Sequence, residues 1–68
     1  MPDPRFTPAA LRRARKAWGH TQQQAATEMD VHLSTIQMWE SGRRKPKGLY
    51  RKVVIDYILG GEQRKQSG

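Results

Sequence analysis

Helix-capping and helix-breaking residues alternate at short intervals along the chain, and this restricts it to short helices. Thr7-Pro8 is typical of a helix start, because Thr caps a free N–H group and Pro at the first helical position loses no needed donor. Gly19 can end that helix in a left-handed conformation. Thr21, followed by Gln24, has the form of a capping box. The sequence therefore predicts a first helix that Gly19 ends and a second helix that Thr21 opens.

The second half of the chain predicts two further helices. Residues 33–40 begin a third helix, which Ser41-Gly42 stops and Pro46 keeps from continuing. The apolar residues of segment 49–59 recur at helical spacing, although the β-branched run Val53-Val54-Ile55 also permits a strand. We favour the helix, so the expected fold is a small all-α domain of four helices.

The size and composition of the chain leave room for one small domain. The 68 residues are 35% hydrophobic and include no cysteine, which excludes disulfides and thiolate metal sites. Two histidines are too few for a structural zinc ion, and no cofactor is expected. The domain is expected to span residues 7–59, between an N-terminal arm (1–6) and a flexible C-terminal tail (60–68). Self-association or ligand binding is the expected source of additional stability.

Most of the positive charge of the chain lies in two blocks. The formal net charge is +7, and no Lys or Arg occurs between Ala17 and Gly42. Such a chain is expected to bind a polyanion, with nucleic acid as the first candidate and an acidic membrane surface or an acidic protein as the second. Two basic flanks around a centre without Lys or Arg indicate phosphate contacts beside a segment that reads finer detail, although chance clustering on a solvated face would give the same pattern. The blocks comprise Arg12, Arg13, Arg15 and Lys16, and then Arg43, Arg44, Lys45, Lys47, Arg51 and Lys52.

Several functional classes have no support in the sequence. No apolar run approaches the length of a membrane span, and residues 1–7 do not have the pattern of a signal peptide. No nucleophile–base pair, metal-ligand cluster or phosphate-binding loop is present, so we do not expect an enzyme. A cytoplasmic protein is expected, associated with the nucleoid through DNA.

Residues 22–41 have the layout of a helix-turn-helix motif. Ala26 is small enough for two helices to cross closely. Hydrophobicity alone does not identify the motif, because any small helical hairpin could show this pattern. The apolar residues that would close the core between the two helices are Met29, Val31, Ile36 and Trp39.

The chain resembles the Xre/Cro-like helix-turn-helix family, which includes phage repressors. The resemblance spans residues 9–59. It rests on LRRARKAWGHTQ at 11–22, Ala26, Ile36 and above all WESGRRKP at 39–46, where family members carry a Glu-x-Gly-x-x-x-Pro ending. It implies a DNA-binding transcriptional regulator in which Arg15 of the first helix pairs with Glu40.

The resemblance also implies which residues contact DNA. Asp30 departs from the family pattern by replacing the usual Gly of the turn, and Asp tolerates positive φ better than most residues. Two of the expected base readers, Leu33 and Met38, are apolar where polar residues are typical. The expected base readers are His32, Leu33, Ser34, Gln37 and Met38. The expected phosphate contacts are Thr21, Gln22 and Gln23 at the start of the second helix, and Arg43, Arg44, Lys45 and Lys47 after the third.

The function expected from these observations is that of a homodimeric repressor, acting on its own operon through a palindromic operator. Its dimer interface is expected on the fourth segment, at Tyr50, Val54, Tyr57 and Ile58, because one small core cannot use both faces of that segment. An antitoxin-type regulator with a toxin as protein partner and a regulator beside anti-CRISPR genes remain open alternatives. A basic RNA-binding protein is a less favoured one, as is a protein-interaction module in which the face of segment 49–59 docks a partner and the charge serves solubility.

Overall fold

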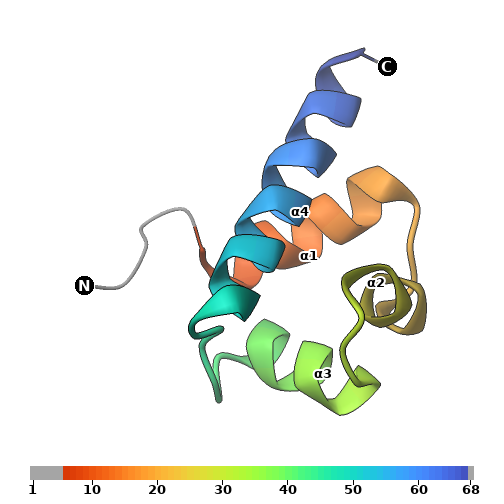
Figure 1. Ribbon diagram of the computed structural model, residues 1–68. Coiled ribbons are helices and arrows are strands. Elements are labelled where there is room, and N and C mark those ends of the chain that lie inside the picture. Colours follow the sequence, from red (N-terminus) through yellow and green to blue (C-terminus); the bar gives the residue numbers. More distant parts are fainter. Residues whose placement is uncertain (1–5, 68) are drawn as a thin grey trace.

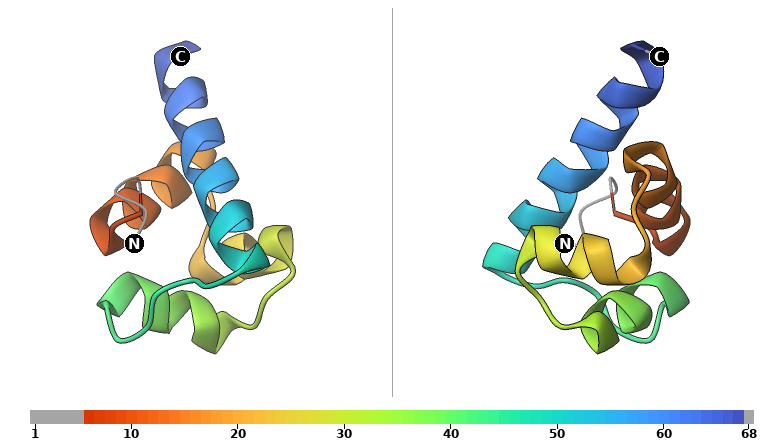
Figure 2. Two further views of the ribbon diagram at one scale, coloured as in Figure 1. Left: turned by 60° about the vertical axis from the view of Figure 1, so that its left-hand side comes forward. Right: turned by 90° about the vertical axis from the view of Figure 1, so that its right-hand side faces the viewer.

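The computed structural model describes residues 6–67, with side chains as far as Gln63. Over that range the chain folds into four helices without a strand, which confirms the predicted all-α fold and the helical form of segment 49–59. The helices are α1 (Pro8–Trp18), α2 (Gln22–Met29), α3 (Leu33–Ser41) and α4 (Leu49–Ser67). Helix α4 lies across α1, and the α2–α3 pair packs beneath them (Figure 1). Figure 2 shows the same arrangement from two further sides.

The predicted capping residues are where the helices begin and end. The Thr7 hydroxyl accepts a hydrogen bond from the Ala10 N–H at 2.9 Å. Thr21 and Gln24 form the reciprocal capping box that starts α2. Gly19 ends α1 in the left-handed conformation, and Asp30 does the same for α2 at φ 57°. The turn therefore places an aspartate in a conformation that costs most L-residues free energy and costs Asp less.

The hydrophobic core lies where the four helices meet, and it draws on every helix. Its buried members are Ala10, Leu11, Ala14, Ala25, Ala26, Met29, Ile36, Trp39, Val54, Tyr57 and Ile58. The helix-turn-helix residues expected to face inward do so, with Val31 partly buried at the edge. The short helices are therefore held by tertiary packing rather than by their own propensity.

The expected flexible tail is wrong for residues 60–67, because α4 continues through them to Ser67. Gly60 and Gly61 lie against α1 at distances that only glycine permits. A Cβ atom at Gly61 would lie 2.9 Å from the Cα of Ala14, and one at Gly60 would lie 2.7 Å from Trp18 Cζ2. The close approach of α1 and α4 thus outweighs the poor helix propensity of the two glycines. Most of the expected N-terminal arm, residues 1–5, lies outside the described residues, as does Gly68.

The expected dimer interface on α4 is also wrong for three of its four residues. Val54, Tyr57 and Ile58 are 0, 6 and 1% exposed, because they form the face of α4 that packs into the core. Tyr50 is 54% exposed and remains on the surface. The apolar residues that α4 leaves open at its start are Leu49, Tyr50 and Val53.

Tyr57 closes the junction between α1, α4 and the loop before α2. Its hydroxyl lies 2.8 Å from His20 Nδ1, and its backbone carbonyl accepts a hydrogen bond from Trp18 Nε1 at 2.9 Å. Burial raises the pKa of Tyr57 to about 12, and the nearby Arg15 guanidinium opposes part of that rise. The phenol is therefore held in its neutral form well above the pH at which a tyrosine in water ionises.

Alkaline pH is expected to destabilise the fold through Tyr57. Below about pH 10 the phenol keeps its proton in both the folded and the unfolded chain. Between about pH 10 and 12 only the unfolded chain loses it, so the free energy of unfolding falls as pH rises. Urea denaturation across this range should show a smaller fall for Tyr57→Phe than for the wild type. Equal slopes for the wild type and Tyr57→Phe would contradict the assignment.

Candidate nucleic-acid interface

A buried ion pair joins α1 to the end of α3. Arg15 Nε donates to Glu40 Oε2 at 2.8 Å, and Arg15 Nη2 donates to Glu40 Oε1 at 3.3 Å. Glu40 is 5% exposed, and the side chain of Arg15 is 16% exposed. The pair expected between these two residues is therefore present, and it is bidentate, the arrangement that gives a guanidinium–carboxylate pair its geometric specificity.

The same carboxylate also fixes α2. Gln22 Nε2 donates to Glu40 Oε1 at 3.2 Å, and Arg12 Nη1 donates to the backbone carbonyl of Glu40. Arg15 Nη1 reaches the carbonyl of His20 at 3.2 Å, in the loop before α2. Glu40 thus links three helices and sets the angle at which α2 and α3 cross. The resemblance gave Gln22 only a phosphate-binding role, so its bond to Glu40 is a function that the sequence did not reveal.

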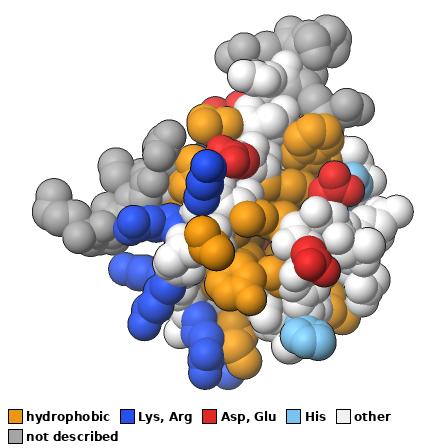
Figure 3. Space-filling view, viewed as in Figure 1, with side chains coloured by type: hydrophobic (Ala, Val, Ile, Leu, Met, Phe, Trp, Pro, Cys, Tyr) orange, Lys and Arg blue, Asp and Glu red, His pale blue; other side chains and the backbone are white. Residues whose placement is uncertain are grey.

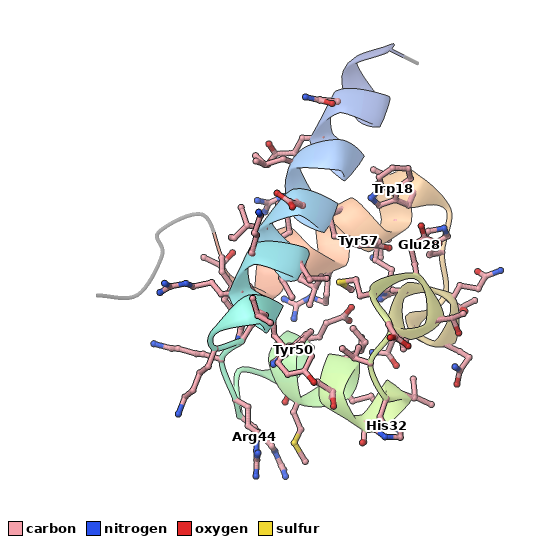
Figure 4. All side chains as sticks on the ribbon, in the orientation of Figure 1. Trp18, Glu28, His32, Arg44, Tyr50 and Tyr57 are labelled. Carbon is pink, nitrogen blue, oxygen red and sulfur yellow. The ribbon has the colours of Figure 1, made fainter. Side chains whose placement is uncertain are left out.

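The expected base readers lie along α3, and most of them are on the surface of the helix. Ser34 and Gln37 are exposed, Met38 is 37% exposed, and Leu33 is half-buried. His32 stands at the N-cap position, but its side chain makes no capping hydrogen bond. Figure 4 shows the His32 side chain at the start of α3, on the outer edge of the molecule. These side chains therefore present donors, acceptors and methyl groups to the surroundings.

The residues expected at the start of α2 are also accessible. Thr21 and Gln23 are exposed, and Gln22 is half-buried beside Glu40. The Thr21 hydroxyl accepts from the Gln24 N–H at 3.1 Å, so it is engaged in the cap. The N-terminus of a helix carries a partial positive charge that favours an anion such as phosphate.

The loop between α3 and α4 carries four closely spaced cations. All four of its cations, Arg43, Arg44, Lys45 and Lys47, are exposed, while Pro46 between them is buried and anchors the loop. Figure 3 shows Lys and Arg side chains gathered along one edge of the molecule, with hydrophobic side chains beside them. Arg44 extends from the loop away from the body of the protein (Figure 4).

One open groove brings the loop and part of α3 together; we call it the α3 groove. Besides the loop cations, its lining includes His32 and Met38, which the sequence predicted, and Thr35 and Tyr50, which it did not. Leu33, Ser34 and Gln37 do not line the groove. In the sequence, the only hint of a role for Tyr50 in this groove is its position shortly after the basic loop. The fold shows that its ring packs near that of Trp39, with ring centroids 6.1 Å apart.

Residues 6–67 show neither a metal-ligand cluster nor a membrane-spanning helix. No cluster of three His, Asp or Glu side chains in that range could hold a metal ion. No helix in the described part of the chain has the length and apolar character needed to cross a membrane.

Comparison with known proteins gives one match. A family model described as helix-turn-helix matches residues 11–49, more than half of the chain, from α1 to the first residue of α4. No curated protein and no solved structure shows a significant match.

Proposed function

Because the chain belongs to the Xre/Cro-like helix-turn-helix family of DNA-binding transcriptional regulators, we propose that it is a repressor whose α3 enters the major groove of an operator. The observation that carries this proposal is the α3 groove, where the loop cations adjoin the His32 and Met38 side of α3. Cations at that place suit the phosphates that border a major groove, and the exposed side chains of α3 suit the base edges within it.

We assign base contacts and phosphate contacts to different residues according to the chemistry of each side chain. Gln37 can form two hydrogen bonds to one adenine, while Met38 and Leu33 can pack on thymine methyl groups. Arg43, Arg44, Lys45 and Lys47 would supply affinity that does not depend on sequence. Thr21, Gln22 and Gln23 would bind a phosphate at the start of α2. The rigid link through Glu40 would keep these phosphate contacts in register with α3.

Two single substitutions distinguish base reading from phosphate binding. Gln37→Ala is expected to weaken binding to the preferred duplex by about 1–3 kcal/mol and to relax preference at one base pair. Arg43→Ala is expected to weaken binding to all duplexes alike and to reduce the dependence on salt. The duplex for this comparison comes from enrichment of a random-sequence duplex pool on the full-length chain. Equal losses from both variants on all duplexes would show that Gln37 does not read bases.

We also propose that the repressor binds an inverted repeat as a homodimer, with half-sites about 34 Å apart. Support comes from the start of α4, where Leu49 is 84% exposed next to exposed Tyr50 and partly exposed Val53. A small domain that leaves such residues open gains stability by covering them with a second copy. A cytoplasmic location beside the DNA is part of the same proposal.

Leu49→Glu is expected to convert the dimer to a monomer in sedimentation velocity experiments, because it places a charge on the proposed apolar contact. The helix should survive, since Leu49 is solvent-exposed and an acidic residue at a helix start is favourable. Leu59→Glu, farther along α4 on another face, serves as the matched control and should remain dimeric. A wild-type chain that sediments as a monomer, or a Leu49→Glu variant that stays dimeric, would overturn this interface.

A further inference from the structure

A second groove lies between the start of α1 and the first turn of α4, and the loop between α3 and α4 forms its floor. We call it the α1–α4 groove. Phe6, Pro8 and Pro46 give it apolar walls, and Arg44, Lys47 and Arg51 bring positive charge to it. It holds about 540 Å³, which is within the range of sites that bind small organic molecules.

Two glycines shape this groove. A Cβ atom at Gly42 would lie 3.7 Å from Pro8 Cγ, so the chain after α3 packs directly against the start of α1. A Cβ atom at Gly48 would meet nothing within 4 Å, so the space beside this glycine is open. Gly48 also has a φ of 59°, a conformation that residues with side chains rarely adopt. Gly48, which lines the groove, thus adds no side chain to it.

We propose that the α1–α4 groove binds a small organic anion, a carboxylate or sulfonate carried on an apolar ring or chain. Among the described residues that line the groove there is no Asp or Glu, and the charged ones are cations. An inorganic anion would leave the walls of Phe6, Pro8 and Pro46 without a partner. A neutral apolar compound would displace water from the cations without replacing its hydrogen bonds. Only a molecule that carries both an anionic group and an apolar ring or chain is complementary to the cations and the apolar walls of the α1–α4 groove.

Occupancy of this groove would oppose DNA binding, an inference that rests on the proposed function. Arg44, Lys45 and Lys47 line both the α1–α4 groove and the α3 groove. An anion bound among them would neutralise charge that the proposed repressor uses for phosphates, and would lower its affinity for every duplex. The anion would thus act as an inducer on the DNA-binding domain itself.

Nuclear magnetic resonance of the ¹⁵N-labelled full-length chain tests the site without DNA. The probe is 2-naphthoate, with 2-naphthylmethanol as the neutral compound of the same ring and inorganic phosphate as the anion without a ring. We expect saturable shifts of the Phe6, Gly42, Gly48 and Arg51 amides with naphthoate, and binding about tenfold weaker or worse with the other two compounds. Equal affinity for all three, shifts centred on Leu49 and Val53, or no saturation by about 10 mM naphthoate would overturn the proposal.

Substitutions then separate the anion site from the DNA site. Arg51→Gln is expected to raise the Kd for naphthoate about tenfold, whereas the neighbouring Lys52→Gln, which does not line the groove, should keep the wild-type Kd. Naphthoate should release duplex DNA from the wild type at concentrations that leave the Arg51→Gln complex intact. Naphthoate binding by a chain that never binds duplex DNA would refute the proposed function and leave the anion site standing. DNA binding without naphthoate binding would refute the anion site and leave the proposed function standing.

Discussion

Glu40→Ala is expected to lower the free energy of unfolding by about 3–5 kcal/mol, the cost of leaving a buried charge without its partner. Glu40 is 5% exposed, and its removal would deprive Arg15 of the two hydrogen bonds that it donates to the carboxylate. Gln22 would lose its bond to the same carboxylate. A domain of this size has only about 3–5 kcal/mol in total, so the variant should be largely unfolded at room temperature.

Urea denaturation followed by the fluorescence of Trp18 and Trp39 measures this loss. The exposed carboxylate Asp56 supplies the control, because Asp56→Ala should change stability by no more than about 0.5 kcal/mol. Arg15→Ala made in the Glu40→Ala background should cost little more, since the two residues act as one unit. A Glu40→Ala protein as stable as the wild type would show that the network does not hold the helices together.

Gly61→Val is expected to cost about 3 kcal/mol, the upper end of the usual range for overpacking a core. Even the Cβ atom of the new side chain would lie 2.9 Å from Ala14 Cα and 3.0 Å from the Ala14 carbonyl oxygen. These are backbone-bound atoms of α1, so relief requires the two helices to separate.

The matched control is Gln63→Val, which puts the same side chain on an exposed position of α4. Its cost should be limited to the helix propensity of Val, about 0.5 kcal/mol. Thermal unfolding of both variants measures the difference. If Gly61→Val and Gln63→Val unfolded at the same temperature, the segment after residue 59 would be the unpacked tail that its composition suggests.

The parts of the fold that follow from local chemistry could be predicted from the sequence. Thr7, Gly19 and Thr21 act within one helical turn of themselves, and their residue types determine what they do. Asp30 could be placed in the turn because the resemblance marks that position for a residue with positive φ. The pairing of Arg15 with Glu40 came from the resemblance alone, since nothing local joins residues so far apart in the chain.

The parts that depend on which helix faces meet could not be predicted. Apolar residues lie on more than one side of α4, so the pattern does not tell Val54, which is buried, from Val53, which is partly exposed. Gly60 and Gly61 usually signal the end of a helix, and only the presence of α1 beside them explains why this helix continues. The α1–α4 groove joins Phe6 to a loop far along the chain, and no local signal marks that contact.

Competition for the full-length chain between three nucleic acids tests the central proposal most directly. We expect the duplex enriched from the random pool to outcompete a scrambled duplex of the same composition by about 10³-fold or more, and to outcompete RNA as well. Its affinity should fall with salt at a log–log slope near −5, as expected for about six phosphate contacts. Equal competition by the enriched duplex, the scrambled duplex and the RNA would contradict sequence-specific DNA recognition by α3.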